Sequence, residues 1–183
     1  MRIQLICLAI AVFAAQWFAS AGDAADSEVD LLFAQLLTAD TETAQQIELR
    51  ILEIWSDSGS PSMNLLLQRG RRAIAQRRHR AAIDHLTALT DHAPQFAEGW
   101  NARATAWFMM GRYELSMADI ERTLALNDRH FGAMAGMAMI LERRGLNEEA
   151  LSVLLVVEGI HPNRQGIGEW IRRLESITRK NLI

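Results

Sequence analysis

A period of 34 residues runs through the middle of this chain and limits how it can fold. Three rows align without a gap, at residues 63–96, 97–130 and 131–164. A small residue stands at the eighth and twentieth places of each row: Gly70, Ala104 and Ala138, then Ala82, Ser116 and Ala150. A large apolar residue stands at the fourth and twenty-fourth places: Leu66, Trp100 and Met134, then Leu86, Ile120 and Leu154. This pattern predicts stacked antiparallel helix pairs, because small side chains let two helices approach closely and large ones fill the space between pairs.

Glycine and proline mark the ends of the predicted helices. Gly111 and Gly145 share one column, at which the first helix of a pair has to end in a left-handed residue. Arg77 replaces the glycine of that column in the first row. Pro94 and Pro162 share another column, which follows the second helix. Each row is therefore expected to hold one helical hairpin.

The rows resemble the tetratricopeptide repeat, whose signature is W-x2-L-G-x2-Y, then A-x3-F, then P. The middle row carries this signature best: Trp100, Ala104, Trp107, Gly111, Tyr113, Ser116 and Ile120. It departs from the family at Arg103, Ser116 and Asp128, where leucine, alanine and proline are preferred. The resemblance implies an all-α, right-handed superhelical solenoid of antiparallel helix pairs. It also implies a non-catalytic scaffold that binds another protein.

The segments that flank the rows are predicted to be helical caps. Residues 22–62 are expected to form a hairpin, with Ser27 opening a first helix to about Ala39 and Thr41 as a candidate cap of the second. Residues 165–183 are expected to form an amphipathic helix that covers the last row. Its apolar stripe consists of Ile167, Trp170, Ile171, Leu174 and Ile177.

Residues 1–21 have the pattern of a secretory signal peptide. Arg2 supplies the positive charge, an uncharged run follows from Leu5 to Ala15, and the small residues before Gly22 suit a signal peptidase. Cleavage is expected after Ala21 or, as second choice, after residue 24, and an uncleaved anchor is the alternative. The single cysteine lies inside this segment, so the mature chain has no disulfide framework. The predicted location is periplasmic or secreted.

The sequence contains no motif that is typical of catalysis. A glycine-rich phosphate loop, a G-x-S-x-G elbow and an H-E-x-x-H motif are all missing. His79, His85 and His92 are 6 and 7 residues apart, which does not suit joint metal binding on one helix. The pair Asp119 and Glu121 is expected on an outward, solvated face. We therefore predict that the protein is not an enzyme and takes no cofactor or metal.

Charge is distributed unevenly along the chain. Residues 22–62 contain nine acids and only one base, whereas the first row contains six arginines: Arg69, Arg71, Arg72, Arg77, Arg78 and Arg80. Two interpretations stay open. The acidic cap and the basic row screen one another, or the arginines form a stripe that docks an acidic partner or anionic lipid. The net charge of −3 gives no overall drive toward nucleic acid, which is not a predicted partner.

The resemblance implies a concave groove lined by places 2, 5, 9, 12 and 13 of each row. The candidate partner-binding residues are Asn64, Leu67, Arg71, Glu98, Asn101, Thr105, Phe108, Met109, Met139 and Arg143. Phe108, Met109 and Met139 would form an adaptable apolar strip suited to a segment of another protein. Packing is the alternative role for Phe108 and Met109.

One subtype of the family is excluded. Members that bind chaperones hold a terminal carboxylate with Lys at place 5 and Asn at place 9 of one repeat, Asn at place 6 of the next, and Lys and Arg after that. The corresponding places here read Leu67, Arg71, Ala102, Gly132 and Gly136. Because only Arg71 offers a charge, the groove is not such a clamp.

Overall fold

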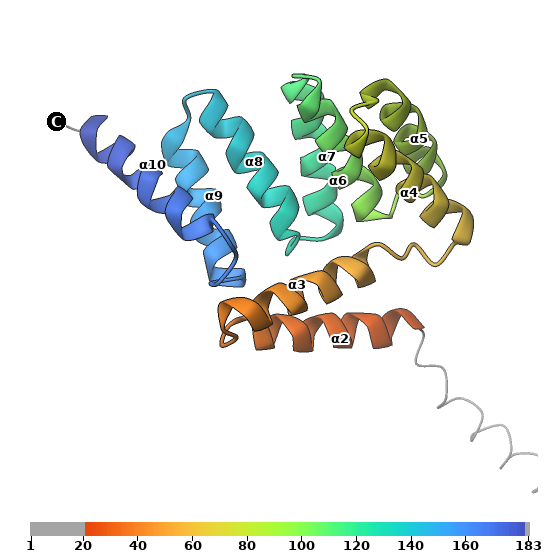
Figure 1. Cartoon of the computed structure of the whole chain (residues 1–183), viewed down its shortest axis with the longest axis horizontal. Coiled ribbons are helices and arrows are strands. Elements are labelled where there is room, and N and C mark those ends of the chain that lie inside the picture. The colour runs from red at the N-terminus through yellow and green to blue at the C-terminus, as the bar shows by residue number, and fades with distance from the viewer. Residues whose placement is uncertain (1–20, 182–183) are drawn as a thin grey trace, which may run out of the picture.

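The computed structural model describes residues 21–181, with side chains for 27–180. In this part of the chain every regular element is an α-helix (Figure 1): α2 (Ala21–Leu36), α3 (Thr41–Trp55), α4 (Pro61–Ala75), α5 (His79–His92), α6 (Ala97–Met109), α7 (Tyr113–Leu126), α8 (Phe131–Arg143), α9 (Asn147–Ile160) and α10 (Ile167–Asn181). Apart from Ala21, the predicted signal peptide lies outside the described residues. None of the helices just named is long and apolar enough to cross a bilayer.

Each 34-residue row contains one antiparallel helix pair, namely α4–α5, α6–α7 and α8–α9. The small residues of the eighth column lie where the two helices of a pair approach closely. A Cβ added at Gly70 would lie 2.5 Å from the Leu86 side chain. Ser116 tolerates the same close approach, because its hydroxyl donates to the Ala104 carbonyl oxygen at 2.8 Å. Serine instead of alanine at the twentieth place of the second row therefore leaves no hydroxyl group without a hydrogen-bond partner.

The first helix of each pair ends in a left-handed residue, as the column of glycines predicts. Gly111 and Gly145 have φ of 70° and 78°, and Arg77 has φ of 58°. A non-glycine residue in this region carries strain of roughly 1–2 kcal/mol. The first row therefore keeps the turn of the other two rows at a conformational cost.

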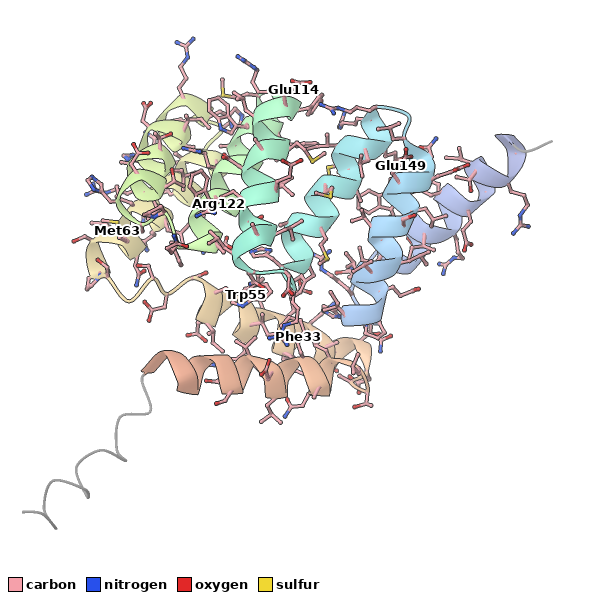
Figure 2. The ribbon with its side chains drawn as sticks, turned by 180° about the vertical axis from the view of Figure 1, so that it is seen from behind. Phe33, Trp55, Met63, Glu114, Arg122 and Glu149 are labelled. Atoms are coloured by element: carbon pink, nitrogen blue, oxygen red, sulfur yellow. The ribbon has the colours of Figure 1, made fainter. Side chains whose placement is uncertain are left out.

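The N-terminal hairpin of α2 and α3 lies across the ends of the stacked helices (Figure 1). Its buried apolar face joins the core formed by α8, α9 and α10, not the core of the first row. Phe33 and Trp55 lie between the hairpin and these helix ends (Figure 2), with ring centroids 6.3 and 5.2 Å from that of Phe131. The hairpin therefore packs along one edge of the stack and does not form an additional repeat in front of the first row.

The helix boundaries of the hairpin differ from the expected ones. The cap of α3 is Asp40, whose carboxylate accepts a hydrogen bond from the Thr43 amide at 2.8 Å, whereas Thr41 is the first helical residue. Ser27 lies inside α2, which begins at Ala21. Aspartate and threonine are both good N-cap residues, so the sequence did not distinguish Asp40 from Thr41. In the structure Asp40 has the extended backbone conformation of an N-cap, and the helix begins at Thr41.

Ion pairs join the acidic hairpin to the later rows. Asp30 contacts Arg129 at 2.6 Å, and Glu48 contacts Arg164 at 3.3 Å. Within the hairpin, Arg50 contacts Glu28 at 2.7 Å. No ion pair among the described residues joins the hairpin to the arginines of the first row. This corrects one of the two interpretations of the charge distribution: the described carboxylates of the acidic cap form no ion pair with the basic row, because the hairpin packs against α8, α9 and α10.

A second correction concerns Asp119, which was expected on a solvated face. Its side chain is only 7% exposed, and it accepts two hydrogen bonds of 2.8 Å from the Arg103 guanidinium. The same guanidinium donates to the Thr90 hydroxyl at 2.8 Å and lies over the Trp100 ring. The arginine that replaces the family's leucine is therefore matched by a buried carboxylate on the facing helix.

Candidate partner-binding groove

Three hollows follow one another along the face formed by α4, α6, α8 and α10. The first, of about 530 Å³, lies beside α4, and the second, of about 190 Å³, lies between α4 and α6. The third, of about 430 Å³, lies between α6, α8 and the beginning of α10. Arg71 borders the first two hollows, while Asn101 and Thr105 border the second and third. Because neighbouring hollows share lining residues, they lie next to one another along this face, and we call this row of hollows the groove.

The third hollow is mostly apolar. Phe108, Met109 and Met139 line it, and Met109 and Met139 are 56% and 39% exposed. The other α8 residues that line it are small: Gly132, Ala135 and Gly136. Small residues on α8 leave side-chain space that an incoming group can fill. The groove therefore combines a hollow with exposed, flexible thioether side chains.

The predicted groove residues fall into two groups. Asn101, Thr105, Phe108, Met109 and Met139 lie together around the third hollow. Phe108 lines this hollow and also packs against Tyr113, with the two ring centroids 5.4 Å apart. The Arg143 guanidinium lies over these two rings, 5.3 Å and 5.8 Å from their centroids, at the rim of the groove.

Three of the predicted groove residues are less accessible to a partner protein than expected: Leu67, Asn64 and Glu98. Leu67 is only 2% exposed, because it packs into the core of the first pair under the first hollow. Asn64 holds the α3–α4 linker, accepting from the Ser58 amide at 2.8 Å and donating to Asp57 at 2.8 Å. These side chains shape the groove rather than contact a partner directly.

Glu98 lies in a polar network at the edge of the groove and is only 4% exposed. Its carboxylate accepts hydrogen bonds from Arg71 at 2.5 Å and from Asn101 at 3.2 Å, and lies 2.8 Å from His130 Nε2. Arg71 also donates to the Ser56 hydroxyl at 2.9 Å. This Glu98 network therefore connects α4, α6, the start of α8 and the end of the hairpin.

The hydrogen bonds of His130 define its tautomer. Its Nδ1 accepts from the Ala133 amide at 3.1 Å, which caps α8, so that nitrogen carries no proton. Nε2 therefore carries the proton and donates it to the Glu98 carboxylate. Burial by itself would raise the pKa of Glu98. The hydrogen bond from His130, together with the positive charge of Arg71 and its hydrogen bond, outweighs this effect and holds the pKa of Glu98 below its ordinary value of 4.5.

Trp170 on α10, which was expected in the apolar packing stripe of that helix, also lines the groove. It lines the third hollow, and its Nε1 donates to Glu142 Oε2 at 2.7 Å. Arg173 binds the same carboxylate through two guanidinium nitrogens, and this pairing is the main reason why the pKa of Glu142 is low. The 34-residue register does not continue into α10, because a row begun at residue 165 would have Gly168 at the large apolar fourth place and Arg172 at the small eighth place. The repeat pattern therefore gave no signal that Trp170 lines the groove.

The five remaining arginines of the first row form the α4–α5 arginine patch: Arg69, Arg72, Arg77, Arg78 and Arg80. All five are exposed. Arg78 donates to the Gln76 side chain, and none of the five forms an ion pair with a carboxylate of the described residues. Their positive charge is therefore uncompensated at this end of the molecule.

Metal coordination has no geometric basis in the described part of the chain, where no three His, Cys, Asp or Glu side chains come together as ligands. Two of the histidines have structural roles instead. His130 belongs to the Glu98 network, and His161 Nε2 lies 3.2 Å from the Glu48 carboxylate of the hairpin. Both imidazoles are buried between the hairpin and the stacked helices.

The stacked helix pairs and the groove between them define an all-α solenoid of the tetratricopeptide type. No protein-family model matches the chain. It is 38% identical over 156 residues to a TPR repeat-containing protein of Rhizobium etli, in an alignment that covers 85% of this chain and 76% of that protein. The chain belongs to the tetratricopeptide repeat (TPR) proteins.

Solved TPR domains share the fold. The first TPR domain of Spaghetti (RPAP3), bound to an HSP90 peptide, superposes with a TM-score of 0.62 at 22% identity, over 66% of this chain and 95% of that chain. The TPR2B domain of yeast Sti1, in its pHsp70 complex, superposes with a TM-score of 0.59 at 15% identity, over 64% and 98%. At these identities the likeness establishes the fold of this chain.

Proposed function

We propose that this protein is a non-catalytic interaction scaffold whose groove docks a segment of another protein. The observation that carries the proposal is the third hollow, where Met109 and Met139 are exposed around a space of about 430 Å³. An exposed apolar hollow on a rigid helical stack is a preformed site for an extended or helical segment. TPR domains of the same fold have been solved with an HSP90 peptide and in a pHsp70 complex, which supports this use of the groove.

The chaperone peptides are not proposed as ligands of this chain. Arg71 is the one charged side chain at the five places of the carboxylate clamp, and its guanidinium is bound to Glu98 and Ser56. A terminal carboxylate at this position would compete with Glu98 for the same guanidinium. The groove is therefore proposed to recognise a segment of different chemistry.

Groove binding predicts a selective loss on introducing charge. The full chain carrying Met109→Glu and Met139→Glu should lose at least tenfold in affinity for a partner that is crosslinked to the wild type, because two carboxylates would enter an apolar contact. Crosslinking followed by a binding assay with the purified partner measures this. The matched control carries Leu155→Glu and Val156→Glu, since these side chains are equally exposed but lie on α9, outside the groove. Equal loss in both variants would contradict the groove assignment.

We propose that the protein works in the bacterial envelope, after removal of residues 1–21. The support is the charged start, the uncharged run and the small residues before Gly22. N-terminal sequencing of the protein from a periplasmic fraction tests this. A chain that still begins at Met1 and stays in the cytoplasm would contradict the proposal.

A second candidate function is association with anionic lipid through the α4–α5 arginine patch. The hairpin carboxylates Asp30, Glu48 and Glu28 pair with Arg129, Arg164 and Arg50, and no described carboxylate forms an ion pair with the patch, which supports a role in binding an external anion. Exposed arginines contribute about 1 kcal/mol each near an anionic surface.

Co-sedimentation with vesicles tests this second candidate. The vesicles contain neutral lipid with about 30% anionic lipid, which gives their surface a negative potential. Co-sedimentation of the full chain is expected at low salt and should collapse near 0.5 M salt, where the Debye length is about 4 Å. Changing Arg69, Arg72 and Arg80 to glutamine should abolish it. The same change at Arg112, Arg172 and Arg179 removes equal charge elsewhere and should not, and equal loss would show that the net charge alone drives binding.

A further inference from the structure

The chemistry of the groove narrows the kind of segment that it can bind, on the basis of the function proposed above. Three arginines on or beside the groove are neutralised by the chain itself: Arg71 by Glu98, Arg164 by Glu48 and Arg173 by Glu142. Because their charges are balanced within the chain, these three arginines offer little net charge to a ligand. Arg143 is the groove arginine that is not paired in this way.

Arg143 is the exception. It forms no ion pair with any carboxylate of the described residues, and its guanidinium is held over the Phe108 and Tyr113 rings. Its neighbour Glu142 is occupied by Arg173 and Trp170. The charge of Arg143 attracts the Glu142 carboxylate, but the ion pair and hydrogen bonds of that carboxylate are made by Arg173 and Trp170. Because Arg143 lies over the ring of Phe108, which lines the third hollow, its guanidinium lies beside that hollow.

The hollow beside Arg143 is large enough for a large side chain. A cavity of about 150 Å³ can hold a benzene ring, and this hollow measures about 430 Å³. The Trp170 ring forms its α10 wall, and the hydrogen bond to Glu142 holds that ring in place. Glu142, which holds the Trp170 ring, and Arg143, which carries the charge, are adjacent residues of α8, so the wall and the charge are held by the same turn of helix.

We infer that the bound segment carries a large apolar residue that enters the third hollow, together with a nearby aspartate or glutamate that pairs with Arg143. The apolar residue supplies buried area, and the carboxylate meets the Arg143 guanidinium, which has no ion-pair partner among the described residues. A segment with a basic residue at that position is rejected by like-charge repulsion. The site thereby selects an acidic, apolar segment of another protein.

A selection from random 12-residue peptides displayed on phage tests this inference with the full chain as target. Enriched peptides should combine an aromatic or large aliphatic residue with an acid a few residues away. In synthetic versions measured by fluorescence anisotropy, replacing the acid with its amide should weaken binding about two- to fivefold. Against the Arg143→Glu variant, the selection should favour lysine or arginine at the same position.

The adjacent Arg144 provides the matched control. It is exposed and paired with Glu114 on α7, so Arg144→Glu should keep the preference for an acid. Peptides that bind wild type but lose binding to the Met109→Glu and Met139→Glu variant, yet show no acid or no change with Arg143→Glu, would overturn the inference and leave groove binding intact. Enrichment of no peptide that depends on the groove would overturn both the inference and the proposed function.

Discussion

Replacing Asp119 with alanine is expected to lower the free energy of unfolding by about 3–5 kcal/mol. The substitution leaves the Arg103 guanidinium, which is largely buried, without the carboxylate that accepts two of its hydrogen bonds. The loss is large because a buried charge without a partner keeps its desolvation penalty and loses its attraction. Thermal unfolding followed by circular dichroism should show a decrease in Tm of roughly 10 °C for a chain of this size.

A double variant distinguishes the net contribution of the Arg103–Asp119 ion pair to stability from the stability that is lost when only one partner is removed. Arg103→Leu combined with Asp119→Leu replaces both charges with apolar groups and restores the leucine that the repeat family prefers at the first position. Replacing a whole buried ion pair is often neutral or stabilising, so most of the lost stability should return. An Asp119→Ala protein as stable as the wild type would mean that water reaches the Arg103 guanidinium.

The second large effect concerns Glu98 and depends on pH. Because the pKa of Glu98 is lower in the folded chain than its usual 4.5, the unfolded chain binds this proton more readily. The resulting stabilisation is fully present above about pH 4.5 and is lost as the pH falls through the folded pKa. At neutral pH, Glu98→Gln should cost about 1–3 kcal/mol, since His130 and Arg71 lose a charged acceptor.

Urea unfolding at pH 7, 5, 4 and 3 measures this effect. The difference in stability between wild type and Glu98→Gln should be largest at pH 7 and should shrink as the wild-type carboxylate is protonated. Glu28→Gln is the matched control, because Glu28 also pairs with an arginine but is exposed, so its effect should be small at every pH. A difference that stays constant from pH 7 to 3 would contradict the role of the Glu98 charge.

The sequence by itself predicts the repeated architecture and much of the third hollow. Periodic small and large residues dictate which faces of neighbouring helices meet, and the backbone of Gly111 and Gly145 obeys a local steric rule. The positions of Phe108, Met109 and Met139 around this hollow follow from the resemblance to the tetratricopeptide repeat, whose groove places these residues occupy. Each of these features depends on residues within one or two turns or within one period.

Only the tertiary structure decided the features that depend on contacts between distant residues. The hairpin lies against α8, α9 and α10 because Trp55 and Phe33 find partners around Phe131, more than 70 residues further along the chain. The same holds for the pairing of Glu98 with His130 and for the place of Trp170 in the groove. No periodic rule encodes such pairs, since their free energy comes from burial and hydrogen bonding that exist only once the helices are stacked.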